Sequence, residues 1–236
     1  RLRSFLDARV ALFVISWPMG CAPSGSLRVG VHRDYHSRFV SKCESDSVVR
    51  RLLSRGISLQ QLLELYIELS VAGTVCPGMR TCQFVHDAVV PKTSDERCAF
   101  MDSQFMHERG GTHFPHKLIS HSWGDELRDT VLTAAIDASQ LDPQQLGEWL
   151  DDGTLVRRLK SSSEAACLSN AYWLCYLAVN QHLSSCNCPQ YHAGHPGCES
   201  DKFDLVMSHI SGGIVVSLGP DLGALRRGWG MLGIGT

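Results

Sequence analysis

Three short apolar runs constrain the fold of this chain more than any other feature. They span residues 118–120, 172–179 and 213–218, and each stops abruptly at polar or turn-forming residues. Such runs are typical of strands that are buried on both faces of a parallel sheet. Stretches with helical spacing separate them, so the pattern predicts an α/β fold with a doubly wound parallel sheet and crossover helices on its faces.

The region before these runs predicts a small helical subdomain over residues 41–105, followed by an α/β domain over 106–236. Residues 47–53 have helical spacing, and Ser58 can cap a second helix with an apolar face. A third helix is predicted over 81–90, closed by Pro91. Within the α/β domain, helices are expected over 127–136, 144–159 and 203–210, and residues 151–153 can break the second of these.

Residues 1–40 are interpreted as a leader or linker. The apolar run Val10–Trp17 follows Arg1, Arg3 and Arg9. It fits the core of a signal peptide, a buried strand or leader sequence, and it is too short to cross a membrane as a helix. Ten cysteines with irregular spacing in a chain of 236 residues do not suggest a small disulfide framework. We therefore expect free thiols, a reducing compartment and a cytoplasmic protein without a transmembrane segment.

The charge pattern gives no reason to expect a nucleic-acid partner. Lys and Arg number 22 against 24 Asp and Glu, whereas a nucleic-acid binder usually carries a clustered basic face. The nearest approach to a cluster is Arg50, Arg51 and Arg55, which we interpret as the solvated face of a helix.

Polar residues follow the first two apolar runs at the expected strand ends. In open α/β sheets, ligands bind at the carboxyl ends of strands, where loop hydroxyls and helix amino-terminal amides converge. Each side chain has an alternative role, which is simply to cap a helix or shape a turn. The candidate ligand-binding residues from these two loops are Ser120, His121, Ser122, Trp123, Gly124, Asn180, Gln181 and His182.

These two loops resemble the TIR-like superfamily. Residues 120–124 (Ser-His-Ser-Trp-Gly) and 173–181 (Trp-Leu-Cys-Tyr-Leu-Ala-Val-Asn-Gln) are most similar to its HET (heterokaryon incompatibility) branch, with Ser-Tyr-x-Trp-Gly and Trp-Ile-Asp-x-x-Cys-Ile-Asn-Gln. They also resemble uncharacterised protist proteins with Ser-His-x-Trp-Gly and Ala-x-Asn-Gln-His. There a Lys-Phe-Asp helix, an apolar strand and Arg-x-Trp-Cys-x-x-Glu follow. Here residues 202–204, 213–218 and 227–229 match in the same order, so the resemblance covers about residues 80–230.

The resemblance implies a flavodoxin-like sheet, a signalling or defence role, and binding or cleavage of an NAD-type nucleotide. It adds Arg227 and Trp229 to the nucleotide-binding candidates, and it suggests assembly with copies of the chain or with other TIR-like domains. In TIR enzymes a glutamate supports the oxocarbenium-like centre that develops during cleavage. Here Gly230 and Gly233 stand where the cysteine and that glutamate are expected, so we expect impaired catalysis and a fold truncated at its carboxyl end.

Two further acidic residues and one cysteine bear on this expectation. Cys175 replaces the aspartate of the HET strand, and as a thiol inside an apolar run it is interpreted as a small hydrophobe. Asp125 and Glu126 are candidate replacements for the missing carboxylate. Their alternative role is to place negative charge in the first turn of the following helix, where the helix dipole favours it.

A second constellation is a loop rich in cysteine and histidine. Five ligand-type residues within thirteen positions suggest a zinc ion that staples the loop, although Cys-x-Cys does not match a standard zinc finger. The alternative is a surface insertion with incidental cysteines. The candidate metal ligands are Cys186, Cys188, His192, His195 and Cys198.

Three functional hypotheses follow from the sequence. The first is a TIR/HET-like signalling or defence module that binds an NAD-type nucleotide. The second is a non-catalytic protein-interaction module of the same fold, or a truncated relic. The third is a zinc-stapled structural protein without a nucleotide site.

Overall fold

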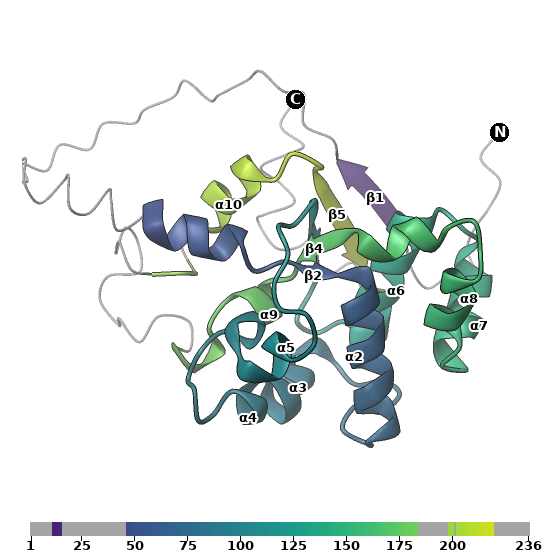
Figure 1. The fold of residues 1–236 in the computed structure, drawn as a ribbon, viewed down its shortest axis with the longest axis horizontal. Helices are drawn as coiled ribbons and strands as arrows, with labels where there is room; N and C mark the ends of the chain where they lie inside the picture. The colour runs from purple at the N-terminus through teal and green to yellow at the C-terminus, as the bar shows by residue number, and fades with distance from the viewer. Residues whose placement is uncertain (1–10, 16–45, 184–197, 201, 220–236) are drawn as a thin grey trace, which may run out of the picture.

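The computed structural model describes residues 11–15, 46–183, 198–200 and 202–219. They form a five-stranded sheet with helices packed on it, which is an α/β architecture (Figure 1). The strand order across the sheet is β1-β5-β3-β4-β2. The strands are β1 (Ala11–Ile15), β2 (Ile57–Ser58), β3 (Lys117–Ser120), β4 (Ala171–Trp173) and β5 (Ile214–Leu218).

The sheet is mixed, so the prediction of a wholly parallel sheet was wrong at its edges. The three central strands β5, β3 and β4 are parallel, whereas β1 pairs with β5 and β2 pairs with β4 in antiparallel orientation. The segments that join β3 to β4 and β4 to β5 contain helices, as expected between parallel strands. The outer strands come from the part of the chain that precedes β3, and an antiparallel edge on an otherwise parallel sheet is common in doubly wound folds.

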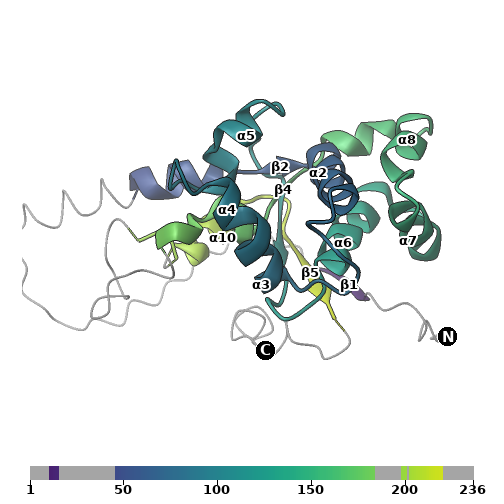
Figure 2. The same cartoon turned by 90° about the horizontal axis from the view of Figure 1, so that it is seen from below.

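Helices cover both faces of the sheet (Figure 2). On one face lie α2 and α6, and on the other lie α10 and the helix at 46–53. The α-helical bounds are 46–53, α2 (Leu59–Val71), α3 (Thr81–Phe84), α4 (Val90–Lys92), α5 (Gln104–His107), α6 (Leu127–Ser139), α7 (Pro143–Asp151), α8 (Leu155–Lys160), α9 (Cys175–Ala178) and α10 (Phe203–His209). Other helical turns are η1 (Val85–Val89), η2 (Phe100–Asp102), η3 (Ala165–Ser169) and η4 (Gln181–Leu183).

Alternation along the central strands divides the core into two layers. Ile119 and Tyr172 point toward α2 and α6, and their strand neighbours Leu118 and Trp173 point toward α10 and the helix at 46–53. Successive strand residues face opposite sides of a sheet. Because both sides are covered by helices, most residues of the central strands are apolar.

The predicted helix cap at Ser58 is confirmed. Ser58 Oγ accepts a hydrogen bond from the amide of Gln61, and Gln61 Oε1 accepts one from the amide of Ser58, which together form a capping box. The Gln61 amide group also donates to the carbonyl oxygens of Arg109 and Gly111. The cap therefore fixes both the start of α2 and the loop that leads to β3.

Two other element predictions have different outcomes. The break at 151–153 is confirmed, since α7 ends at Asp151 and α8 begins at Leu155. Pro91 does not close the third helix, which continues to Lys92 through a π-helical turn over η1. This wider turn eases the clash that a proline makes with the preceding turn of an α-helix.

The strand predicted over 172–179 was wrong beyond its second residue. β4 ends at Trp173, and α9 begins at Cys175. Most residues of this run are buried. A short run that is apolar at nearly every position shows neither the period of a strand nor that of a helix, so its sequence does not distinguish the two.

The helical region before β3 is not a separate unit in the described residues. One continuous core includes Leu62 and Leu65 of α2, Phe84 of α3, Ile119 of β3 and Val131 of α6. The predicted boundary between residues 105 and 106 therefore crosses a shared core. β1 also lies within the region predicted to be a leader or linker, which selects the strand interpretation for residues 11–15.

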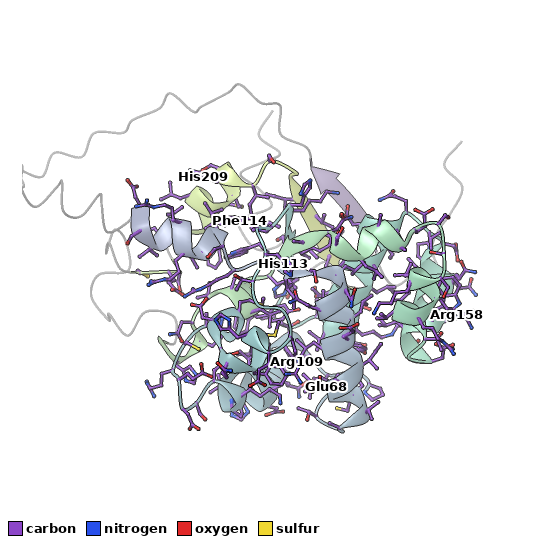
Figure 3. The ribbon with its side chains drawn as sticks, in the orientation of Figure 1. Glu68, Arg109, His113, Phe114, Arg158 and His209 are labelled. Atoms are coloured by element: carbon purple, nitrogen blue, oxygen red, sulfur yellow. The ribbon has the colours of Figure 1, made fainter. Side chains whose placement is uncertain are left out.

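The surface next to β3 carries an exposed ion pair and an exposed aromatic ring. Glu68 and Arg109 form an exposed ion pair at 2.8 Å, and Phe114 is exposed on the loop before β3 (Figure 3). Among the described residues, none of the helices has both the length and the apolar character that crossing a membrane requires.

Candidate functional site

The connections of the central strands define where a ligand site is expected. β3 is followed by α6, which covers one face of the sheet, and β4 leads through α9 to α10, which covers the other. β3 and β4 are adjacent and parallel. When two neighbouring strands send their connections to opposite faces, their carboxyl ends diverge into the place where open α/β sheets bind ligands. The sequence-predicted loops after β3 and β4 meet there.

His121 is the central side chain of this region. It is buried, with its Nε2 atom 3.3 Å from Cys175 Sγ and its Nδ1 atom 3.3 Å from the carbonyl oxygen of Ser122. The ring of Tyr176 packs edge-on against the imidazole, with centroids 5.1 Å apart. Thus the loop after β3 supplies the imidazole, and α9, which follows β4, supplies the thiol and the aromatic ring that fix its position.

The rest of the loop after β3 is held in place by hydrogen bonds. The amide of Ser122 donates to Asp125 Oδ2 at 3.3 Å, and the amide of Gly124 donates to Ser122 Oγ at 3.2 Å. The amides of Thr81 and Cys82 donate to the carbonyl oxygens of Asp125 and Trp123, respectively, both at 3.0 Å. These hydrogen bonds therefore attach the loop to α3, and Trp123 is partly exposed on the loop.

The same loop contacts the end of β5 through Asp125. A Cβ atom placed on Gly219 would lie 2.5 Å from Asp125 Oδ1, so only glycine fits at this point without displacement. Asp125 is buried and oriented by the amide of Ser122. Its position joins the carboxyl ends of β3 and β5, which is a structural use of the carboxylate.

The three polar residues after α9 are engaged mainly with the protein itself. Asn180 Nδ2 donates to the carbonyl oxygen of Arg97 at 2.7 Å, and its Oδ1 accepts from the amide of His182 at 2.9 Å. Gln181 Nε2 donates to the carbonyl oxygen of Val179, and His182 Nε2 lies 2.7 Å from Thr93 Oγ1. For these residues the structure shows the turn-forming role that the sequence left open.

A buried arginine that the sequence analysis assigned to a solvated helix face holds this turn from beneath. Arg55 is 4% exposed, and its guanidinium bonds to Asp102, to Glu199 and to the carbonyl oxygen of Ala178. Glu199 in turn accepts from the amide of Asn180 at 2.8 Å. Arg55 does not lie on a solvated helix face, because it follows the helix at 46–53 and turns inward, where two carboxylates compensate its charge.

Burial alone would lower the pKa of the Arg55 guanidinium. Hydrogen bonding and the charges of Asp102 and Glu199 more than offset this effect, so the pKa is raised. Arg55 therefore stays charged at all relevant pH values. It joins four segments that are distant in sequence, which no local pattern could have revealed.

At the opposite end of the sheet, a second polar cluster has a structural role. Lys117 Nζ lies 2.8 Å from Asp137 Oδ1, and the hydroxyl of Tyr172 donates to Asp137 Oδ2 at 2.7 Å. Burial, followed by this hydrogen bond, raises the pKa of Tyr172. The cluster ties α6 to the first residues of β3 and β4, away from the loops that follow these strands.

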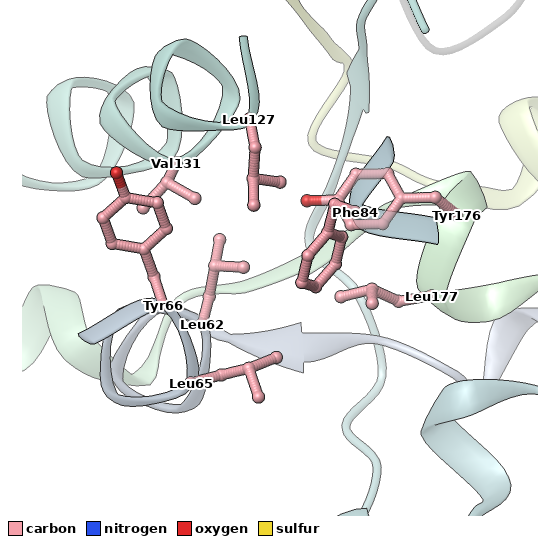
Figure 4. Close-up of a pocket in the computed structure, with 8 residues that line it drawn as sticks. All are labelled: Leu62, Leu65, Tyr66, Phe84, Leu127, Val131, Tyr176 and Leu177. Atoms are coloured by element: carbon pink, nitrogen blue, oxygen red, sulfur yellow. The ribbon is translucent and has the colours of Figure 1, made fainter. Parts of the chain in front are cut away.

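A small apolar cavity lies beside the site, between α2, α3, α6 and α9 (Figure 4). Its volume is ≈ 10 Å³, about that of one water molecule and far below that of a nucleotide. Its lining residues are Leu62, Leu65, Tyr66, Phe84, Leu127, Val131, Tyr176 and Leu177.

Several predicted site residues lie outside the described residues. These are Arg227 and Trp229 of the nucleotide set, and Cys186, Cys188, His192 and His195 of the metal set. Of the proposed zinc ligands only Cys198 is described, and it is buried. Within the part of the chain that the structure describes, three or more His, Cys, Asp or Glu residues do not come together as a metal site.

Comparison with known proteins gave no match to a protein family, to a curated protein or to a solved structure.

Proposed function

We propose that the chain is a cytoplasmic TIR/HET-like signalling or defence module that binds an NAD-type nucleotide at the carboxyl ends of β3 and β4 and does not cleave it. The observation that carries the proposal is that these adjacent parallel strands send their connections to opposite faces. The loop motif at residues 120–124 lies at that point.

Three features of the loop suit a nucleotide. The indole of Trp123 is partly exposed and offers a stacking surface for a base. Ser120 is partly exposed at the end of β3, and Gly124 is exposed and allows close approach of a ligand to the backbone. The hydrogen bonds from Thr81 and Cys82 fix the loop in advance, so that little ordering is required on binding.

The absence of cleavage follows from residue types. Breaking the bond between nicotinamide and ribose creates positive charge on the sugar, which a carboxylate stabilises. Gly233 supplies none at the position where the resemblance expects a glutamate. Asp125 is a poor substitute, because it is buried and accepts a hydrogen bond from Ser122 within the loop.

Calorimetric titration with NAD tests binding, and chromatography of released nicotinamide tests cleavage. We expect saturable binding to the unmodified chain and no nicotinamide release above the buffer rate. Trp123→Ala should weaken binding about tenfold or more, because stacking of a base on an aromatic ring contributes roughly 1–3 kcal/mol. Trp149→Ala is the matched control, since Trp149 is also partly buried but lies on α7.

Two results would overturn the proposal. Absence of saturable binding to the unmodified chain, or equal affinity in the Trp123 and Trp149 variants, would remove the nucleotide site from the β3 loop. Stoichiometric or faster release of nicotinamide would instead show that another group supplies the missing carboxylate.

A further inference from the structure

The contact between Cys175 of α9 and His121 of the loop after β3 brings together a nucleophile and a base. The Sγ atom and the Nε2 atom are 3.3 Å apart, within the range of a hydrogen bond that involves sulfur. The residues are 54 positions apart in sequence, so the fold alone creates the pair. A thiol next to an imidazole is the arrangement that activates cysteine for nucleophilic attack.

The hydrogen bonding of the imidazole assigns the two nitrogens their roles. Nδ1 lies 3.3 Å from the carbonyl oxygen of Ser122, and a carbonyl oxygen can only accept a hydrogen bond. Nδ1 therefore carries the hydrogen, which leaves the lone pair of Nε2 directed at the thiol. Nucleophile, base and a third group that orients the base are thus all present.

The surroundings hold this pair in one geometry. The Tyr176 ring packs edge-on against His121, and the carbonyl oxygen of Cys175 accepts hydrogen bonds from the Val179 amide at 3.0 Å and from Gln181 Nε2 at 3.4 Å. Cys175 is partly exposed, whereas His121 is 5% exposed. The thiol is therefore partly accessible while its base is buried, an arrangement that suits a small electrophile.

We propose that Cys175 is a nucleophilic thiol, activated by His121, that reacts with small hydroperoxides and so serves as an oxidation site. The assignment goes beyond nucleotide binding and does not depend on it. Four of the five other described cysteines (Cys76, Cys82, Cys98 and Cys167) provide comparisons within the same molecule.

The reaction balances without a further cofactor. The thiol proton passes from Sγ to Nε2, and a sulfur electron pair forms an S–O bond to one peroxide oxygen while the O–O bond breaks. The departing oxygen takes the proton from the imidazolium and leaves as an alcohol, or as water when the peroxide is hydrogen peroxide. The products are a cysteine sulfenic acid, in which sulfur is oxidised by two electrons, and that alcohol or water, to which the peroxide is reduced.

The test is peroxide treatment of the whole chain at about pH 7 in the presence of dimedone, with labelling at each cysteine followed by peptide mass spectrometry. Exposure alone predicts that Cys76 and Cys82, both exposed, react faster than Cys175. The proposal predicts the reverse, with Cys175 labelled about tenfold faster or more. Labelling of Cys175 no faster than that of Cys76 and Cys82 in the unmodified chain overturns the proposal, whatever any variant does.

A variant then isolates the contribution of the imidazole. His121→Ala should slow the labelling of Cys175 about tenfold and leave Cys76 and Cys82 unchanged, whereas an unchanged Cys175 rate would refute the role of His121. Cys167 reports on folding in the same experiment, because it is buried and burial raises the pKa of its thiol. A variant in which Cys167 stays unlabelled has kept its fold, and if Cys167 becomes labelled the comparison within the unmodified chain decides the matter.

Discussion

Arg55 offers the sharpest test of how the polar interior is stabilised. Arg55→Met keeps the length of the side chain and removes its charge. The loss leaves Glu199, whose side chain is 6% exposed, without its closest cationic partner at 2.8 Å. Stranding a buried charge in this way costs about 3–5 kcal/mol.

The structure places the expected value at the lower end of that range. Glu199 keeps the hydrogen bond from the amide of Asn180 and the more distant Arg51 at 3.4 Å. Asp102 is 33% exposed and can be rehydrated when its bonds to Arg55 are lost. We therefore expect a loss of about 3 kcal/mol in the free energy of unfolding, which corresponds to a fall in Tm of roughly 6–12 °C for a domain of this size.

Urea unfolding followed by circular dichroism measures this loss. Arg51→Met is the matched control, because Arg51 touches the same carboxylate but is 53% exposed, and a surface pair of this kind contributes about 1 kcal/mol or less. Adding Glu199→Gln to Arg55→Met should recover about 2 kcal/mol, since the stranded charge disappears. Free energies of unfolding of the two arginine variants that differ by less than about 1 kcal/mol would refute the stranded charge. A double variant no more stable than Arg55→Met would refute it as well.

Three further predictions use the same unfolding assay. Ser58→Ala should lower the free energy of unfolding by about 1 kcal/mol through loss of the capping box, and Ser58→Gly by less, so an unchanged midpoint would contradict the cap. Tyr176→Phe should stabilise the fold by about 1–3 kcal/mol, because the Tyr176 hydroxyl is buried without a hydrogen-bond partner among the described residues. Burial also raises the pKa of Tyr176 above its value in the unfolded chain. Ionisation of this tyrosine therefore leaves the free energy of unfolding unchanged below about pH 10 and lowers it by roughly 1.4 kcal/mol per pH unit as pH rises further. A Phe variant with the same alkaline slope would refute this. Gly212→Ala should destabilise by about 1–3 kcal/mol, since the added Cβ would collide with the carbonyl oxygen of His116, and a neutral effect would show that β5 can shift.

Elements with a local cause were predictable from sequence. Ser58 and Gln61 determine the start of α2 by bonding to each other, and the glycine at 153 allows the positive φ of 71° that separates α7 from α8. The strands at 118–120 and 214–218 were predicted because their apolar runs are short and stop at turn-forming residues. In each case the deciding interaction lies within a few residues.

Features that depend on contacts between distant segments were not predictable. Whether residues 174–179 continue β4 or form α9 depends on the packing of Tyr176 against Phe84 and His121, which come from other elements. Cys175 resembles a small hydrophobe in the sequence, because nothing in its own run indicates an imidazole 3.3 Å away. Arg55 was assigned to a solvated surface for the same reason.

The order of strands in the sheet has a consequence for synthesis on the ribosome. Ala11 of β1 pairs with Leu218 of β5, and Ile57 of β2 pairs with Tyr172 of β4, so both edge strands leave the ribosome before the strands that they join. At about 5–20 residues per second, β1 emerges roughly 10–40 s ahead of its partner. Unpaired strands of this kind are templates for wrong association. The sheet is complete only after β5 has been made, so β1 spends most of synthesis without the strand that it joins.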